Sequence, residues 1–333
     1  MSVRSDDCSE YAFGPAVRLR VRGSRRAAAH FALEFGPRLE PMPDPQVDLD
    51  VEWRAAGRGA GGYKTARWHV ELSHPEDRPL RATIRLSGPP PSFALSLAQG
   101  WFVEPLVAVA LAREGYVALP SAGLVLDDGA LVLMGPSGSG KSSLSVRALA
   151  LGHSPLGDDQ VLTREDGGCL PYPRRLRIYP DIRETAPEAW LRLRRSTRRT
   201  LAVRRAVRRL TRGFVAPSLA VPASEIAPQT PPGVLPLKRL LVVERDAGSS
   251  EVEVERRDAA WAVDRAGTIL ADQRGRLLAI ADERWRHALS AVAERELEIL
   301  RSAMDAASVE HVRLPTGWEA SRAVTALARQ AGL

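Results

Sequence analysis

Short runs of alternating apolar and polar residues occupy the first 98 positions of the chain. Residues 17–22 and 68–72 show this period of two, which predicts half-exposed β-strands. Turn-forming stretches at 41–45 and 58–62 separate such runs. The prolines at 89–91 mark a boundary, since consecutive prolines continue neither a helix nor a central strand. We therefore expect a β-rich N-terminal lobe at residues 1–98 and a second domain at 99–333.

The second domain begins with a helical pattern followed by a hairpin pattern. Apolar residues recur at helical spacing from 102 to 113, and Gly115 supplies a stop. The apolar runs 123–126 and 130–134 flank Asp127, Asp128 and Gly129, and Asp-Gly between apolar runs is typical of a β-hairpin. A helix at 142–151 that ends at Gly152, a strand at 158–163 and a second hairpin near residue 167 are predicted next.

The remaining pattern alternates between helices and strands, as in an α/β protein. Residues 188–213 predict an arginine-rich helical segment, and 216–236 a proline-rich loop. A strand at 240–244, helices near 257–265 and 281–304, a strand near 308–314 and a final helix from about 318 complete the chain.

One motif stands between the first hairpin and the helix that follows it. Gly135-Pro136-Ser137-Gly138-Ser139-Gly140-Lys141-Ser142 matches the phosphate-loop spacing G-x-x-x-x-G-K-[ST] at every required position. Its glycines let successive amide groups point at phosphate oxygens, and the helix start adds partial positive charge. We expect Lys141 to reach the β- and γ-phosphates of ATP, and the Ser142 hydroxyl to ligate Mg²⁺. Ser143, the next residue, completes the predicted nucleotide-binding set.

Two adjacent aspartates follow the loop. Asp158 and Asp159 come directly after Gly157, which lies sixteen residues after Lys141. Paired aspartates at a strand edge that faces the loop can divide two tasks, one as a magnesium ligand and one as a general base toward an acceptor hydroxyl. A phosphate loop alone does not distinguish kinases from ATPases or GTPases, so these aspartates carry the functional prediction.

Residues 135–144, 148–153 and 156–159 together resemble the HPr serine kinase family and its HPr-kinase-related members. Those proteins place a loop, a short helix, a glycine and a double aspartate in the same order. The resemblance covers about residues 101–182. It implies a P-loop kinase core related to phosphoenolpyruvate carboxykinase, which is an α/β fold with a mixed sheet, accompanied by a separate N-terminal lobe.

The resemblance also implies roles for individual residues. Asp158 or Asp159 would take the proton from the acceptor hydroxyl, which makes Asp158, Asp159 and Lys141 the catalytic set. Ser142, Asp158 and Glu184 would hold Mg²⁺, Glu184 because it falls near the place of a further family carboxylate. The acceptor would be a serine of a protein or peptide, or a small alcohol. Family members are often oligomers, which leaves a homo-oligomer open.

Two departures from the family pattern bear on the reaction. Pro120 stands where bifunctional members have a histidine, and Ser143 stands where they have a glutamate. We therefore expect a kinase without the reverse, phosphorolytic activity. A nucleotide-binding regulatory module without phosphotransfer is an alternative, given Pro120. A P-loop ATPase is another, but we find neither an L-S-G-G-Q signature nor an apolar strand ending in Asp-Glu.

Composition adds a strong bias toward arginine. The net charge of the 333 residues is +7, and the lysines are Lys64, Lys141 and Lys238. Cys8 and Cys169 are too few for a disulfide framework or a zinc site, so we expect free thiols. No apolar run reaches the roughly 18 residues that span a bilayer, and the first residues lack a secretory pattern. We expect a cytoplasmic protein without a membrane partner.

The arginines concentrate in the predicted helical segment. They accompany Leu201, Val203, Val207 and Leu210, which on a helix predicts a basic face opposite an apolar stripe. The arginines are Arg192, Arg194, Arg195, Arg204, Arg205, Arg208, Arg209 and Arg212. This face is either solvated or binds an acidic partner. A nucleic-acid partner is not expected, because no aromatic side chains alternate with the arginines to stack on bases.

Overall fold

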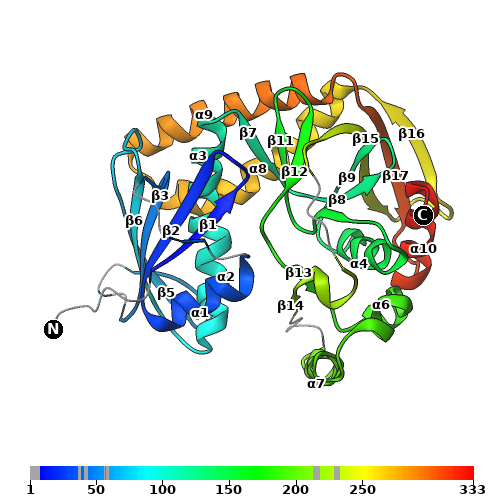
Figure 1. Ribbon diagram of the computed structural model, residues 1–333, viewed down its shortest axis with the longest axis horizontal. Coiled ribbons are helices and arrows are strands. Elements are labelled where there is room, and N and C mark those ends of the chain that lie inside the picture. Colours follow the sequence, from blue (N-terminus) through cyan, green and yellow to red (C-terminus); the bar gives the residue numbers. More distant parts are fainter. Residues whose placement is uncertain are drawn as a thin grey trace. The chain divides into compact units, whose positions relative to one another are not determined.

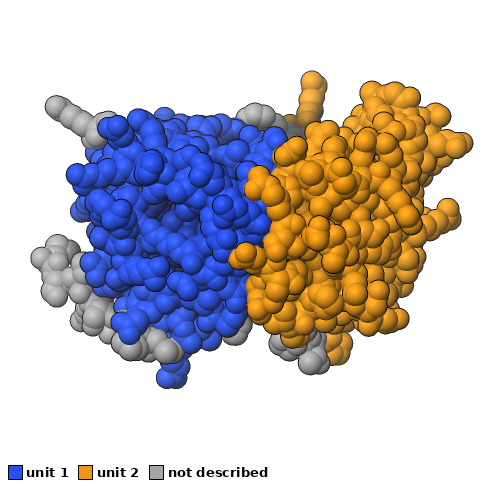
Figure 2. All heavy atoms as spheres, turned by 90° about the horizontal axis from the view of Figure 1, so that it is seen from above, with its two compact units in different colours: residues 1–118, 267–299 blue, residues 119–266, 300–333 orange. Residues whose placement is uncertain are grey.

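A computed structural model describes residues 8–36, 39–40, 44–55, 57, 60–212, 218–228 and 233–333 (Figure 1). It has two compact units, which we call the N-terminal and the C-terminal unit (Figure 2). The first comprises Met1–Ala118 and Gly267–Ile299, and the second Leu119–Ala266 and Leu300–Leu333. This division differs from the expected boundary after residue 98. The predicted turns at 41–45 and 58–62 and the loop at 216–236 lie partly outside the described residues.

The N-terminal unit is built on a six-stranded sheet in the order β1-β2-β3-β6-β5-β4. The pairs β2-β3 and β3-β6 are parallel, and the other neighbours are antiparallel. Side chains of β2 alternate as the sequence predicts: Val17, Leu19 and Val21 are buried, whereas the arginines between them are not. The strands are β1 (Ser9–Phe13), β2 (Val17–Gly23), β3 (Val47–Trp53), β4 (Gly61–Tyr63), β5 (Ala66–Leu72) and β6 (Leu80–Ser87).

Helices accompany this sheet. They are α1 (Arg25–Glu34), α2 (Pro91–Ala98), the π-helical turn η1 (Gln99–Val103) and α3 (Glu104–Arg113). The last three form one continuous run, so the helix expected at 102–113 begins eleven residues earlier. Gln99 is buried at the π-helical turn, where its side chain bonds both His30 (2.9 Å) and Glu104 (2.8 Å).

The same helical run corrects our expectation that no apolar segment of the chain is long enough to span a bilayer. Pro91–Arg113 is long and apolar enough to cross a membrane by length and composition, contrary to our expectation. Within the protein, 72% of its most apolar window is buried. Buried core helices of globular proteins share these properties, since they too are apolar on every side.

A mixed sheet forms the centre of the C-terminal unit. Its strands follow the order β10-β8-β9-β15-β12-β11, and β17 pairs with both β15 and β16. The strand β15 runs parallel to β9 and β17, whereas β8 and β9 form the predicted antiparallel hairpin. The chain passes between the units near β7 (Tyr116–Leu119). The strands are β8 (Ser121–Leu126), β9 (Gly129–Met134), β10 (Pro155–Gly157), β11 (Val161–Arg164), β12 (Gly168–Pro171), β15 (Leu235–Asp246), β16 (Glu253–Arg257) and β17 (Ser308–Pro315).

The helix after the loop and the last helix pack on one face of this sheet. Leu144 and Ala148 share a core with Leu133, Leu241 and Leu327. On another side, residues of the loop helix pack with the segment that contains the arginines. The elements are α4 (Lys141–Leu151), α5 (Ile182–Thr185), α6 (Pro187–Arg192), α7 (Arg195–Leu210), α10 (Ala320–Ala331), the short strands β13 (Leu176–Ile178) and β14 (Leu219–Val221), and the turn η2 (Ala223–Glu225).

Two long helices each contribute to both units. They are α8 (Ala259–Ile280) and α9 (Glu283–Met304), and the unit boundaries fall within them. The sequence pattern predicts α9 well, but α8 extends fifteen residues beyond the expected end at 265. Together with the mixed sheets, these helices confirm an α/β fold.

Candidate functional site

The loop of residues 135–142 joins the end of β9 to the start of α4, as the motif requires. Gly135 has a φ of +150°, and a Cβ atom there would collide with the backbone oxygen of Val243 on β15. Glycine is therefore needed where the loop leaves the sheet. Among the described residues no side chain caps α4, and its first turn has no acidic residue. The amide groups at the start of α4 are thus available to an anion.

Lys141 folds back on the loop. Its ammonium group donates to the carbonyl oxygens of Gly135 (2.6 Å) and Pro136 (3.0 Å) and lies 3.3 Å from the Ser139 hydroxyl. Burial lowers the pKa of Lys141, and the charges of Asp159 and Asp158 oppose that shift. The loop lysine therefore lies within electrostatic range of both predicted aspartates.

The two aspartates lie at the sheet edge where the loop begins. The strand β10 is antiparallel to β8, and β8 is antiparallel to β9, so β10 and β9 end at the same edge. Asp158 follows β10 directly, and the strand expected at 158–163 begins only at Val161. A tight turn causes this difference: a Cβ atom on Gly157 would collide with the carbonyl oxygen of Gln160. Glycine before the double aspartate is required by this close approach.

Asp158 is buried, with 3% of its surface exposed. One carboxylate oxygen accepts a hydrogen bond from the Arg177 amide (2.7 Å), and the other has no hydrogen-bond partner among the described residues. Burial, reinforced by the charge of Asp159, raises the pKa of Asp158 to about 7, although the Arg177 amide and the Ser142 hydroxyl oppose the shift. Asp158 is thus a carboxyl group that gains or loses its proton near neutral pH.

Asp159 is 33% exposed and forms an ion pair with Arg174 (3.2 Å). Its backbone oxygen accepts from the amide of Ser121, the residue after Pro120. Burial raises the pKa of Tyr179, and the charges of Asp159 and Asp158 add to the shift, so this phenol lies near both carboxylates. The two aspartates therefore differ: Asp158 is buried beside Ser142, and Asp159 is partly exposed and paired with a cation.

Ser142 and Asp158 fit a magnesium ion. Magnesium usually binds one or two carboxylates, with phosphate oxygens and water completing its octahedron. The unpartnered oxygen of Asp158 and the nearby Ser142 hydroxyl supply ligands of this kind. In the described part of the chain no group of three or more His, Cys, Asp or Glu side chains could hold a metal by itself. An ion here would thus rely on the nucleotide for further oxygens.

Glu184, the third predicted metal ligand, has a different neighbour. It lies on α5 and forms an ion pair with Arg205 of α7 (2.5 Å). Asp181, two residues after Tyr179, pairs with Arg208 on the same helix (3.3 Å). Glu184 is therefore occupied by an arginine, and its role as a metal ligand stays a prediction.

The structure adds three residues to the predicted site, namely Arg174, Arg177 and Tyr179. Arg174 binds Asp159, the amide of Arg177 binds Asp158, and Tyr179 lies near both. They come from the short segment at β13, whose alternation of arginine with Leu176 and Ile178 marks a strand but gives no functional signal. Glu244 is a fourth addition, because it lies near the end of β15, which runs parallel to the loop strand.

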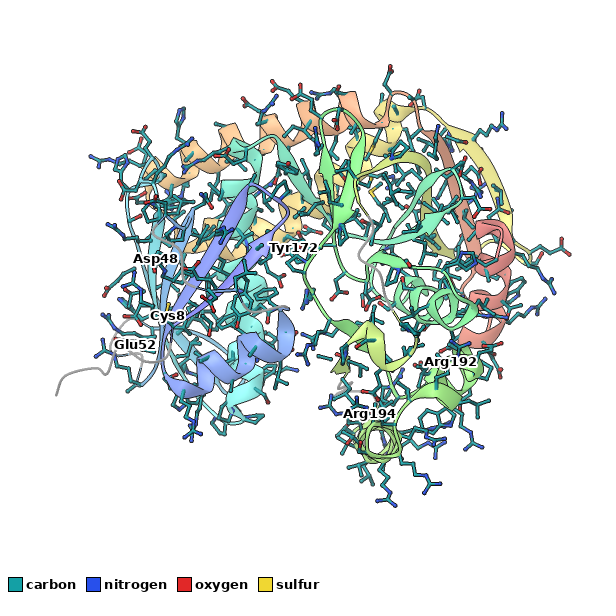
Figure 3. The ribbon with its side chains drawn as sticks, viewed as in Figure 1. Cys8, Asp48, Glu52, Tyr172, Arg192 and Arg194 are labelled. Carbon is teal, nitrogen blue, oxygen red and sulfur yellow. The ribbon has the colours of Figure 1, made fainter. Side chains whose placement is uncertain are left out.

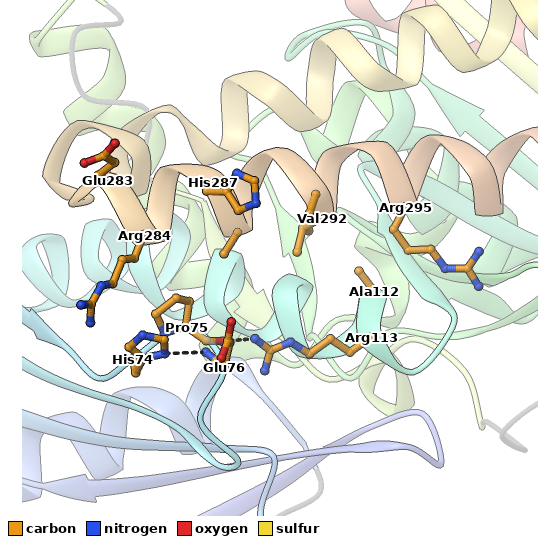
Figure 4. A pocket seen from close by; sticks show the side chains of 12 residues that line it. His74, Pro75, Glu76, Ala112, Arg113, Glu283, Arg284, His287, Val292 and Arg295 are labelled. Carbon is orange, nitrogen blue, oxygen red and sulfur yellow. Dashed lines mark hydrogen bonds between the residues drawn. The ribbon is translucent and has the colours of Figure 1, made fainter.

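A separate cavity of about 810 Å³ lies within the N-terminal unit (Figure 4). Its lining includes the apolar Ala112 and Val292 together with arginines and histidines. Arg113 reaches across to the backbone oxygen of Pro75, and burial lowers the pKa of its guanidinium. The described residues that line this cavity include neither a lysine nor an aspartate, so its chemistry is unlike that of the loop.

No family model matches the chain, and no curated protein matches it. Neither Cys8 nor Cys169 forms a disulfide within the described residues. Burial raises the pKa of the Cys169 thiol to about 12, which keeps it protonated and unreactive.

Proposed function

We propose that the chain is an ATP-dependent kinase of the HPr serine kinase-like type, which transfers the γ-phosphoryl group to a hydroxyl of a protein, a peptide or a small alcohol. One observation carries this proposal: two aspartates follow a strand that ends at the same sheet edge as the phosphate loop, and both lie within electrostatic range of Lys141. A nucleotide-binding loop and a proton acceptor are the two parts that hydroxyl kinases require.

Each residue has a role in the proposed reaction. The loop amides and Lys141 hold the phosphates, and Ser142 with Asp158 would hold Mg²⁺, which neutralises charge on the transferring group. The acceptor oxygen attacks the γ-phosphorus, the bond to the β-γ bridging oxygen breaks, and ADP leaves. Asp159, which is partly exposed, takes the hydroxyl proton once its ion pair with Arg174 has opened. We place this activity in the cytoplasm.

Transfer of label from γ-labelled ATP tests the proposal. The protein is incubated with Mg²⁺ and with proteins from neighbouring genes, serine peptides or small alcohols. We expect Asp159→Asn to reduce transfer by about 10²–10⁴-fold, the usual contribution of a general base. Lys141→Ala should cost about 10³-fold, since it removes the charge that stabilises the transferring group. Lys238→Ala removes an exposed lysine of β15 and serves as the matched control.

The outcomes separate the proposal from its alternatives. Transfer that Lys238→Ala retains and Lys141→Ala loses supports the kinase. Clear nucleotide binding without transfer to any acceptor contradicts it and favours a regulatory module.

A P-loop ATPase is the second candidate, and Glu244 favours it. Many P-loop NTPases hold Mg²⁺ with a carboxylate on a strand near the loop. Glu244 lies near the end of the apolar strand β15, beside the loop strand, with His311 at 3.1 Å and Arg265 at 3.7 Å. Phosphate release without an acceptor that is abolished by Glu244→Gln, but not by Asp159→Asn, would establish this candidate instead.

A further inference from the structure

The helix α7 presents arginines that no acidic side chain neutralises. It contains seven arginines and no acidic residue. Two more arginines, Arg192 and Arg194, lie just before it and are labelled in Figure 3. Several arginines of this segment are exposed and have no acidic partner among the described residues. They are Arg192, Arg195, Arg199, Arg209 and Arg212, whereas the backbone amide of Arg194 donates to the carboxylate of Glu225 (3.1 Å).

Apolar side chains lie between these arginines on the outward face. Arg195, Arg199, Ala202, Ala206 and Arg209 follow one another at helical spacing, and all are exposed. Beside them Val203 is 65% exposed and Leu210 is 85% exposed. The apolar stripe predicted from the sequence is therefore mostly not buried. Leu201 is the one residue of α7 that is buried. The result is an exposed apolar strip with arginines at both ends.

The inner flank of α7, in contrast, is neutralised. Arg205 pairs with Glu184, and Arg208 pairs with Asp181. Arg204 donates to the backbone oxygen of Ser218. Like charges three and four residues apart destabilise a helix, and these inner contacts offset that repulsion on one side only. The outward side retains its charge.

The same contacts tie α7 to the candidate active site. Asp181 and Glu184 follow closely after Tyr179, which lies near Asp158 and Asp159. Arg177, whose amide binds Asp158, is also near enough to Arg204 for its charge to lower the pKa of that guanidinium, after the larger effect of burial. A molecule bound on α7 would therefore contact a helix that residues 179–184 connect to Asp158 and Asp159.

We infer that the outward face of α7 docks an acidic segment of the phosphoryl acceptor, with carboxylates on the arginines and one or two apolar side chains over Val203 and Leu210. This inference rests on the proposed kinase function. The chemistry favours a peptide over other anions. A membrane-surface helix has bulky Trp, Phe or Leu side chains along its apolar face, whereas this face has small alanines at its centre. Base stacking needs aromatic side chains, and α7 has none.

Binding of a defined acidic peptide tests the inference without nucleotide. The probe is a fluorescein-labelled peptide of glutamates interrupted by two leucines, titrated with the full chain and followed by anisotropy. The variant Arg195→Glu/Arg199→Glu/Arg209→Glu reverses three charges on the outward face. The control Arg25→Glu/Arg286→Glu/Arg301→Glu reverses three exposed charges on α1 and α9. We expect the α7 variant to bind at least about tenfold more weakly and the control to stay within about twofold.

A second measurement links the surface to catalysis. With a serine added to the peptide, the α7 variant should raise KM about tenfold and leave kcat unchanged, because docking lies outside the chemical step. Equal losses in both variants would overturn the inference. Binding to phosphatidylserine vesicles that is lost in the α7 variant, without peptide binding, would overturn it in favour of a membrane. Selective peptide binding without transfer to any acceptor would support the docking surface while refuting the proposed kinase.

Discussion

Two deeply buried carboxylates, one from each unit, differ in what surrounds them. Glu296, in the α9 part of the N-terminal unit, is 1% exposed and accepts a hydrogen bond from the buried guanidinium of Arg274 on α8. Asp158 in the C-terminal unit has an amide, a nearby hydroxyl and an unpartnered oxygen. Burial raises the pKa of both groups. Similar burial thus accompanies a neutralised structural pair in one unit and, in the other, a carboxylate with an unpartnered oxygen, where we propose a cation site.

The partners of a buried acid distinguish a structural role from a functional one. A buried charge with a dedicated counter-charge is a structural element, and breaking the pair costs stability. A buried acid that has no counter-charge of this kind and keeps an unpartnered oxygen next to a phosphate loop is not explained by ion pairing. Its cost to the fold is understandable if a cation binds there, as at sites where function is favoured over stability.

The largest expected effect comes from breaking the structural pair. Arg274→Met leaves the carboxylate of Glu296 buried without its cation, so we expect the free energy of unfolding to fall by about 3–5 kcal/mol. Chemical denaturation followed by tryptophan fluorescence measures it. The double variant Arg274→Met/Glu296→Leu should recover most of the loss, because no buried charge remains. A loss below about 1 kcal/mol in the single variant would remove the structural half of the comparison.

The second expected effect has the opposite sign. The ordinary pKa of Asp158 is 3.8, and in the folded chain it is about 7. The folded state therefore binds more protons than the unfolded state between these values, and stability falls as pH rises from about 4 to about 7. The asparagine of the Asp158→Asn variant does not ionise, so its stability does not fall in this way as pH rises. At pH 8 we therefore expect the variant to be about 2 kcal/mol more stable than the wild type.

Denaturation at several pH values measures this effect. The advantage of Asp158→Asn should shrink steadily between pH 7 and pH 4, while Asp159→Asn, at a partly exposed ion pair, should change stability by less than about 1 kcal/mol. An advantage that does not vary with pH would show that the carboxyl of Asp158 is not the source.

The contrast between the units also explains what the sequence could predict. Local patterns sufficed for β8, β9, the loop and α4, because turn residues and periodicity are encoded over a few positions. The strands β2 and β5 of the N-terminal unit were predictable for the same reason. The division between the units was not, since parts of α8 and α9 join the N-terminal unit through contacts far apart in sequence.

The candidate site shows the same limit. Spacing from the loop suffices to select Lys141, Ser142, Asp158 and Asp159. It gives no sign that Arg174 pairs with Asp159 or that Glu184 pairs with Arg205, because both contacts depend on how β13 and α7 pack. Nor does helical periodicity separate Leu201, which is buried, from Leu210, which is exposed.

A third effect concerns the predicted cation. Ser142→Ala removes one proposed ligand and leaves Asp158 in place, so we expect the Mg²⁺ concentration for half-maximal transfer to rise about tenfold. Kinase assays at varied Mg²⁺ and saturating ATP measure it. Ser145→Ala, on the same helix, removes a buried hydroxyl without a partner in the described residues and is the matched control. An unchanged Mg²⁺ requirement in Ser142→Ala would argue against the cation site at Asp158.

The smallest expected effect belongs to Glu184, the carboxylate that sequence reasoning assigned to the metal. It is exposed and paired with Arg205, and exposed pairs of this kind contribute about 0–1 kcal/mol. We therefore expect Glu184→Gln to change the Mg²⁺ requirement by less than about twofold and to weaken binding of the acidic peptide little, since Arg205 lies on the inner flank of α7. If Glu184→Gln instead raised the Mg²⁺ requirement as much as Ser142→Ala, Glu184 would have to leave Arg205 when nucleotide binds. A second carboxylate, from α5, would then join Asp158 as a ligand of the proposed magnesium ion.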